Sequence, residues 1–146
     1  MSDSSDAVAT LLVNIDVSDL EQAIGFYTTG LGLTVRWRPY PNIAELQGGS
    51  SPVFLTEKPP GTLPCPEAPR PREYCRHWTP VHLDFVVPDL ELAIRRAESA
   101  GARHEGAIRE YAEARYTIMS DPFGNGFCLL QFKDSGYTSL QSHETD

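Results

Sequence analysis

The sequence has few basic residues. Its 146 residues contain 12 Lys and Arg against 20 Asp and Glu, which gives a formal net charge of −8. Proteins that bind nucleic acid draw much of their affinity from Lys and Arg on phosphates, so this balance argues against a nucleic-acid partner. A neutral or cationic small molecule suits the charge better.

The sequence also lacks a long apolar run and a basic, apolar leader. Its first ten residues, MSDSSDAVAT, are polar and acidic, and no stretch approaches the ~18 apolar residues of a membrane helix. We therefore expect no membrane contact and a cytoplasmic location. Cysteine is equally scarce, and the odd count of Cys65, Cys75 and Cys128 argues against a disulfide framework. Reduced thiols are the simpler interpretation.

What the chain does contain suits one globular domain. Apolar residues make up 40% and charged residues 22%, a mixture typical of a folded protein long enough to bury a core. In the first half, helical spacing after the N-cap signal Ser18-Asp19 follows a β-rich run at residues 10–17. Three further strands are predicted at residues 33–37, 43–46 and 53–56.

The second half repeats this order. We predict a strand at residues 80–87, a helix at 90–99 that starts after Asp89, and strands at 104–108, 114–119 and 127–132. The phrase VSDLEQAI, which begins at Val17, is identical at six of eight positions to VPDLELAI, which begins at Val87. Two capped amphipathic helices can match by chance, but the shared strand-helix-strand context favours a duplicated βαβββ module.

These patterns divide the chain into four parts. Residues 8–57 form the first module, a proline-rich linker occupies residues 58–79, the second module occupies residues 80–132, and residues 133–146 are a tail. The linker is predicted because residues 58–71 hold six of the twelve prolines, too many for a helix or an inner strand. The fold class is α+β.

Two phrases carry a family resemblance. Val17 to Tyr27 followed by Gly30-Leu31-Gly32-Leu33, and Asp121-Pro122-Phe123-Gly124-Asn125 near the end, resemble the vicinal oxygen chelate superfamily, which groups glyoxalase I, bleomycin-resistance proteins and extradiol dioxygenases. The resemblance implies that the two modules curl their strands into a concave, partly open, barrel-like cleft. It also implies a homodimer.

The resemblance further implies where a metal would bind. In metal-using relatives, each module supplies two ligands. One lies on the first strand, seven residues before the Asp that starts the helix, and the other lies on the last strand. In this sequence those positions carry Leu12, Phe54, His82 and Cys128, of which Leu12 and Phe54 have no ligand atom. We therefore expect no cofactor and no metal of the usual kind. The alternative is a divalent ion held by His82, Cys128 and Glu57. A one-residue slip in the alignment of Phe54 would bring Glu57 closer, and we expect Glu57 and Phe54 to share a face of their strand.

Several side chains are candidates to bind a ligand. If His82 faces the cleft, period-two alternation also points Asp84 inward, with Asn14 on the matching first strand. His82, Asp84 and Cys128 are the candidates for catalysis: the histidine as a general base beside Asp84, and the cysteine as a thiolate nucleophile. Cys128 in FCLLQF could equally be a small buried apolar residue.

The aromatic candidates are Trp37, Tyr40, Phe54 and Tyr116, whose faces would suit a flat or cationic ligand, although core or dimer packing explains them equally well. The full ligand-binding set is Leu12, Asn14, Trp37, Phe54, His82, Asp84, Tyr116 and Cys128.

Three functions fit this reading. The first is a protein that binds or sequesters a small aromatic or cationic molecule, as bleomycin-resistance proteins do, without the usual metal. The second is a glyoxalase-like or dioxygenase-like metalloenzyme, a lyase or oxidoreductase, with an altered site. The third is a structural or regulatory partner with a vestigial cleft. The sequence leaves open whether the chain is an enzyme.

Overall fold

The computed structural model describes residues 8–134. It contains two four-stranded mixed sheets with strand orders β1-β4-β3-β2 and β5-β8-β7-β6. The elements of the first module are β1 (Val13–Val17), α1 (Leu20–Gly25), η2 (Phe26–Gly30), β2 (Thr34–Tyr40), β3 (Ile43–Gln47) and β4 (Val53–Glu57). Those of the second are β5 (Leu83–Val86), α2 (Leu90–Ser99), β6 (Arg103–Glu110), β7 (Ala114–Ser120) and β8 (Gly126–Phe132). The prediction of an α+β fold with two βαβββ modules is confirmed.

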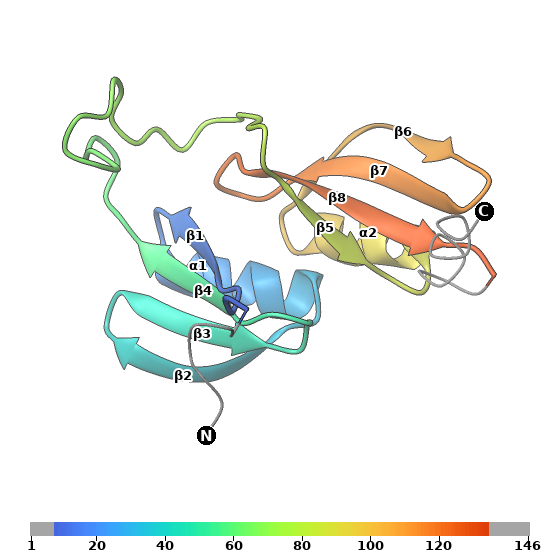
Figure 1. Ribbon diagram of the computed structural model, residues 1–146, viewed down its shortest axis with the longest axis horizontal. Coiled ribbons are helices and arrows are strands. Elements are labelled where there is room, and N and C mark those ends of the chain that lie inside the picture. The colour runs from blue at the N-terminus through green and yellow to red at the C-terminus, as the bar shows by residue number, and fades with distance from the viewer. Residues whose placement is uncertain (1–7, 135–146) are drawn as a thin grey trace.

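The two sheets lie side by side, and the helices cover the same side of both (Figure 1). In each sheet the first strand of the module pairs in parallel with the last, and the remaining pairs are antiparallel. Strands β1 and β5 are therefore edge strands. They are the edges that each sheet turns towards the other module.

The strand registers repeat between the modules. Asn14 pairs with Phe54 in the first module, and Asp84 pairs with Cys128 in the second. The helix starts repeat as well, since Asp19 Oδ1 accepts from the Gln22 amide and Asp89 Oδ1 from the Leu92 amide, both at 3.0 Å. The duplication inferred from the sequence is thus carried by backbone pairing and by capping.

A second cap repeats at each helix start. Glu57 at the end of β4 accepts a hydrogen bond from the Leu20 amide at 2.9 Å, and Gln131 in β8 accepts one from the Leu90 amide at 2.8 Å. Each occupies an amide that the helix itself leaves without a partner. The last strand of each module therefore fixes the first turn of the module's own helix.

The helix of the first module also joins the two modules. It continues from α1 into the π-helical segment η2, where Phe26 and Tyr27 are buried. The Phe26 ring lies 6.2 Å from the ring of Phe127, and the Tyr27 hydroxyl donates to Asp121 at 2.7 Å. Burial raises the pKa of Tyr27 well above its ordinary value, and the Asp121 charge adds to the effect. The modules therefore share one core.

The Asp121-to-Asn125 turn is the second module's anchor for this contact. Asp121 also accepts from the amides of Phe123 and Asn125, both at 2.9 Å. Gly124 has a positive φ of 86°, and a Cβ there would lie 2.1 Å from the Cys75 carbonyl oxygen. Only glycine permits both the turn and the close approach of the linker.

The linker is held by contacts to both modules and within itself. Residues 58–82 contain no helix or strand, yet Arg72 Nε lies 2.8 Å from Asp16 Oδ2 and the Tyr74 hydroxyl donates to the Lys58 carbonyl at 2.6 Å. The His77 amide donates to the Gly124 carbonyl at 3.0 Å. The proline-rich segment therefore holds a defined path between the modules.

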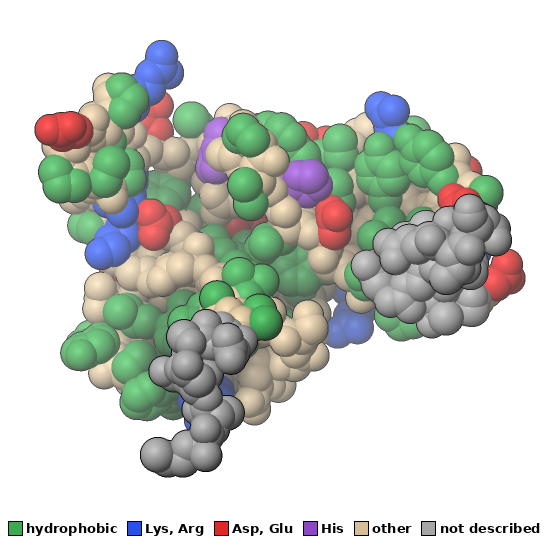
Figure 2. Space-filling view, viewed as in Figure 1, with side chains coloured by type: hydrophobic (Ala, Val, Ile, Leu, Met, Phe, Trp, Pro, Cys, Tyr) green, Lys and Arg blue, Asp and Glu red, His purple; other side chains and the backbone are tan. Residues whose placement is uncertain are grey.

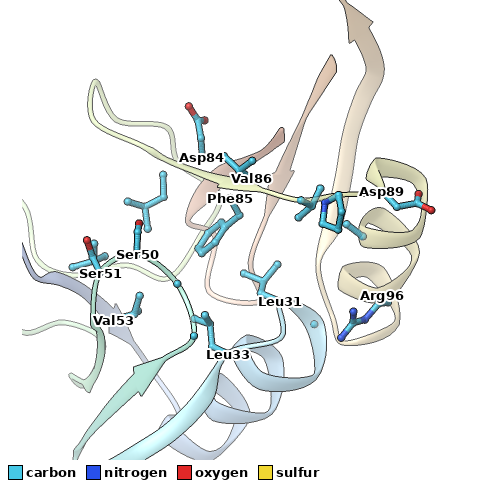
Figure 3. A pocket seen from close by; sticks show the side chains of 18 of the residues that line it. Leu31, Leu33, Ser50, Ser51, Val53, Asp84, Phe85, Val86, Asp89 and Arg96 are labelled. Carbon is cyan, nitrogen blue, oxygen red and sulfur yellow. The ribbon is translucent and has the colours of Figure 1, made fainter. Parts of the chain in front are cut away.

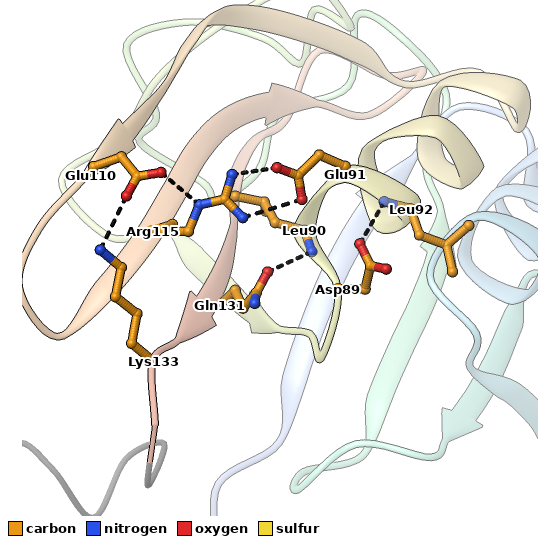
Figure 4. A network of polar contacts seen from close by, with 8 residues as sticks. All are labelled: Asp89, Leu90, Glu91, Leu92, Glu110, Arg115, Gln131 and Lys133. Carbon is orange, nitrogen blue, oxygen red and sulfur yellow. Dashed lines mark hydrogen bonds and ion pairs between the residues drawn. The ribbon is translucent and has the colours of Figure 1, made fainter.

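A polar network fastens the far edge of the second sheet (Figure 4). Arg115 in β7 pairs with Glu91 at the start of α2 and with Glu110 at the end of β6. Lys133 Nζ lies 3.0 Å from Glu110 Oε2. This ion pair joins Lys133, the first residue after β8, to the end of β6. The predicted tails at residues 1–7 and 135–146 lie outside the described residues.

Within residues 8–134, no helix is long and apolar enough to span a membrane.

Candidate functional site

A cleft of about 650 Å³ lies between the two modules (Figure 3). Its first wall comes from the start of β1, the end of η2 and the loop that precedes β4. The apolar residues of this wall are Leu11, Val13, Leu31, Leu33 and Val53. The second wall comes from β5 and the first turns of α2, with Leu83, Phe85, Val86, Val87, Leu92 and Ala93. Strands β1 and β5 both contribute to the cleft and belong to different sheets.

Few polar groups interrupt these walls. They are Ser50 and Ser51 in the loop before β4, Asp84 in β5, and Asp89 and Arg96 at α2. Asp89 already caps α2 through the Leu92 amide. The Asp84 side chain is half-exposed, and its carboxylate points away from Leu31 and Leu33, at the outer rim of the cleft (Figure 3).

The surface over the cleft is apolar and open. Val86 is 61% exposed, Leu11 67% and Leu92 43%, although all three are hydrophobic. In the space-filling view hydrophobic side chains gather over the hollow junction of the modules, with His and acidic side chains beside them (Figure 2). Exposed apolar side chains grouped in one hollow are typical of a ligand or partner site.

A polar cluster lies on the open face of the second sheet, next to the cleft. His82, Asp84 and Cys128 bring one ligand atom each to within 4.8 Å of one another. His82 Nε2 lies 3.2 Å from Asp84 Oδ1. His82 and Asp84 share a face because they are two residues apart, and Cys128 joins them because it pairs with Asp84 across the ladder.

The environment of Cys128 favours the neutral thiol. The residue is buried, with 5% of its surface exposed. Burial raises its pKa to about 11, and the Asp84 charge and hydrogen bond add to the shift. In the metal-free protein this geometry disfavours the thiolate nucleophile considered from the sequence, because the neighbouring charge is negative.

An aromatic stack covers the other side of His82. The Trp78 ring lies 4.7 Å from the imidazole at an interplanar angle of 33°, and the Arg76 guanidinium lies 5.4 Å from the indole centroid. Arg76 in turn pairs with Glu105 of β6. A Cβ on Gly126 would lie 2.3 Å from the Trp78 ring. The linker thus packs the Trp78 ring between Gly126 of β8 and His82, and this packing restricts the imidazole.

The predicted ligand residues of the first module lie on a separate sheet. Asn14 accepts from the Thr56 hydroxyl at 3.0 Å, and the Trp37 indole donates to Glu45 at 3.4 Å. Leu12 is 56% exposed just before β1, and Phe54 is the ladder partner of Asn14. In the second module, Tyr116 stacks on Tyr111 with ring centroids 5.8 Å apart. None of these five residues lines the cleft.

Asp84 alone of the eight predicted ligand residues lines the cleft, and it is also the member that the cleft shares with the polar cluster. Sequence reasoning missed Leu31, Ser50, Val86 and Leu92. Gly48-Gly49 before Ser50 marked a turn, and the apolar residues followed ordinary core patterns. No signal in the sequence indicated that the first turns of α2 would face the loop before β4.

Glu57 does not join the cluster. A separation of three residues along β4 puts Glu57 and Phe54 on opposite faces, so the expectation that they share one is wrong. Glu57 instead faces the helix, where it accepts from the Leu20 amide. Phe54 pairs with Asn14 as Cys128 pairs with Asp84, so the two residues hold equivalent positions in their modules. The alignment of Phe54 with Cys128 is therefore correct without the one-residue slip that would have favoured Glu57.

The four inherited metal positions therefore do not make a complete metal site. His82 and Cys128 supply nitrogen and sulfur, but Leu12 and Phe54 supply no ligand atom, and among residues 8–134 no other ligand from the first module joins the cluster. The chain does not fit the four-ligand ion that the resemblance implies.

Comparison with protein families gives one match that spans most of the chain. The model of the glyoxalase-like domain matches residues 12–130, a range that includes both modules and the linker. No curated protein sequence is significantly similar to the chain.

Solved structures with the same fold are known from several bacteria. A member of the glyoxalase/bleomycin resistance protein/dioxygenase superfamily from Sphaerobacter thermophilus is 23% identical, with a TM-score of 0.63 over 86% of this chain and 98% of that one. A glyoxalase-related enzyme from Fulvimarina pelagi is 17% identical, with a TM-score of 0.63 over 86% and 88%. A family enzyme from Burkholderia phytofirmans is 18% identical, with a TM-score of 0.60 over 82% and 95%. At these identities the likeness shows the fold.

Proposed function

The chain belongs to the glyoxalase-like domain family of the vicinal oxygen chelate superfamily, and we propose that it binds or sequesters a small molecule in the cleft between its modules. In this proposal the four-ligand metal centre of metal-using relatives plays no part. The observation that carries it is the cleft itself, about 650 Å³ with apolar walls from both modules. Pockets that hold small molecules have this size, with mostly apolar walls and few polar groups.

The charges near the cleft favour a ligand with an apolar body and a cationic or hydrogen-bond-donating group. Asp84 offers a carboxylate at the rim, and the chain as a whole carries a formal charge of −8. An aromatic amine combines an apolar face for Val86 and Leu92 with a cation for Asp84. Ligands with a carboxylate in place of the amine should bind more weakly.

A thermal-shift screen tests this function. The panel contains aromatic amines, their carboxylate analogues, short aromatic peptides and thiol adducts. Saturation at one hundred times Kd stabilises a folded protein by about 2.7 kcal/mol, so a genuine ligand gives a clear rise in Tm. Asp84→Asn should reduce the rise for amines and leave it unchanged for neutral ligands.

Two exposed leucines provide a matched pair of variants. Leu92 lines the cleft and is 43% exposed, whereas Leu63 lies in the linker and is 52% exposed. Leu92→Asn should remove the ligand-induced shift, and Leu63→Asn should preserve it. An equal loss of the ligand-induced shift in both variants would contradict binding in the cleft. No shift with any member of the panel would also contradict it and would favour a partner protein whose cleft is vestigial.

The second candidate function is a metalloenzyme with an altered site. The observation that favours it is the convergence of His82, Asp84 and Cys128 within 4.8 Å beside the cleft. Metal-dependent turnover of a thiol adduct or a catechol, abolished by His82→Gln, would favour this function over sequestration. Binding without turnover would favour the first.

A homodimer and a cytoplasmic location stay predictions. Light scattering after size-exclusion chromatography measures the first directly, and a mass of one chain at all concentrations would contradict it.

A further inference from the structure

We propose that His82, Asp84 and Cys128 form a binding site for one zinc-like divalent ion, contained entirely within the second module. The site shares only Asp84 with the ligand cleft, and it does not depend on ligand binding there. It differs from the four-position site of metal-using relatives in its third ligand, since Asp84 is not one of the four inherited positions, and in needing nothing from the first module.

The three ligand atoms are close enough for one ion. Zinc binds sulfur at about 2.3 Å and nitrogen or oxygen at about 2.0 Å, so neighbouring ligands of a tetrahedral ion lie roughly 3.5 Å apart. His82 Nε2 and Asp84 Oδ1 are already 3.2 Å apart, and all three atoms lie within 4.8 Å of one another. Side-chain rotation alone can close the remaining distance.

The backbone supports this arrangement. Asp84 and Cys128 are direct ladder partners between β5 and β8, and β8 is an inner strand of its sheet. His82 lies two residues before Asp84 on the same face, and Trp78 stacks on its ring at 4.7 Å. Two ligands therefore project from a paired strand position, and the third is held by an aromatic contact, which lowers the entropy lost on binding.

The donor set selects the kind of ion. One sulfur, one imidazole nitrogen and one carboxylate oxygen suit Zn²⁺ or Co²⁺, whereas Mg²⁺ and Ca²⁺ prefer oxygen ligands alone. The His82 and Asp84 side chains are 34% and 49% exposed. A fourth position is thus accessible to water or to a small molecule, as in zinc sites with three protein ligands.

Cobalt titration tests the site with a signal specific for a thiolate ligand. The full chain carries Cys65→Ser and Cys75→Ser, because these two cysteines are exposed and free, which leaves Cys128 as the only thiol. We expect one Co²⁺ per chain, a thiolate-to-cobalt charge-transfer band, and loss of that band when Zn²⁺ displaces Co²⁺. Absence of the band would overturn the proposal.

Three variants in this background assign the ligands. Cys128→Ser should abolish the charge-transfer band, and Asp84→Asn and His82→Gln should each weaken Co²⁺ binding at least tenfold. His77→Gln, a histidine in the exposed linker, is the control and should bind normally. Unchanged affinity in both Asp84→Asn and His82→Gln would overturn the proposal.

Circular dichroism of the metal-free variants separates ligand loss from misfolding. Cys128 is buried and its replacement can disturb the sheet, but His82 and Asp84 are exposed, and their variants should fold as the parent does. The tenfold weakening in these two variants therefore decides the proposal even if Cys128→Ser does not fold.

Discussion

The first and second modules agree on the helix side of their sheets and differ on the open side. On the helix side, Asp19 and Asp89 cap their helices in the same way, and Glu57 and Gln131 accept from equivalent amides. On the open side, Leu12, Asn14 and Phe54 of the first module correspond to His82, Asp84 and Cys128 of the second. The contacts that build each module are duplicated, whereas the groups that could carry chemistry are present in one.

The two sides of the sheets differ in how much a substitution costs. The helix side is buried, so a changed contact there leaves a polar group without a partner or a void. The open side meets solvent and the cleft, where substitutions cost less. The scaffold can therefore stay symmetric while the faces diverge.

The largest expected effect is a second metal site, created in the first module. The substitutions Leu12→His, Asn14→Asp and Phe54→Cys copy the second module's cluster onto matching register positions. If the scaffolds are equivalent, equilibrium dialysis should show Co²⁺ stoichiometry rising from one to two per chain. A stoichiometry that stays at one would contradict the equivalence of the two scaffolds and would point to the contact of Trp78 with His82 in the second module.

The next effect concerns the turns before the last strands. Asp121 accepts from the Tyr27 hydroxyl, two amides and the Asn125 side chain. Asp121→Ala should therefore cost about 3 kcal/mol of unfolding free energy or more, because these buried donors lose their partner. By strand register, Gly48 stands at the corresponding position of the first module, and the exposed Gln47 directly precedes it. Urea denaturation of Gln47→Ala should show a change within about 0.5 kcal/mol. Equal costs would contradict the asymmetry of the two turns.

A smaller effect, similar in the two modules, is expected at the cap that the last strand of each module gives to its helix. Glu57→Ala should cost about 1.5 kcal/mol and Gln131→Ala about 1 kcal/mol, the former being larger because a charged acceptor also interacts with the helix dipole. Chemical denaturation of both variants measures the two costs, with Glu57→Gln as the isosteric control. A negligible cost in either variant would show that this cap is duplicated in geometry only.

The smallest effect is expected at the exposed ion pairs of the helix starts. Glu91 pairs with Arg115, and Glu21 at the equivalent place in the first module pairs with Arg38. Arg115→Ala should lower Tm slightly more than Arg38→Ala does, since Arg115 is less exposed and also binds Glu110. Both decreases should shrink in high salt.

The pH dependence of the Arg115 effect follows from the direction of the Glu91 pKa shift. The hydrogen bond from Arg115 holds the pKa of Glu91 below its ordinary value. The folded state therefore prefers the ionised carboxylate, and the stabilisation is present at neutral pH and lost as pH falls through the acidic range. Melting curves of the Arg115→Ala variant and the parent should converge in acid. A constant difference would point to packing of the Arg115 stem.

Much of the fold could be read from the residues. The Asp19 and Asp89 caps, the periodic apolar residues after them and the glycine stops predicted both helices, and α2 (Leu90–Ser99) has the predicted bounds. Local signals of this kind act within a few residues, so they survive any tertiary arrangement. The π-helical turn at η2 was not predictable, because packing of Phe26 and Tyr27 against the second module accompanies it.

The sequence by itself determined the duplicated module, the family, and the loss of ligand atoms at Leu12 and Phe54, since these follow from residue type, order and spacing. Only the tertiary structure decided that Asp84 is the residue shared by the cleft and the polar cluster, that Glu57 faces a helix, and that the cleft walls come from β5, α2 and the loop before β4. The physical reason is that side-chain direction in a strand depends on register, and a cleft between modules depends on packing between residues distant in sequence.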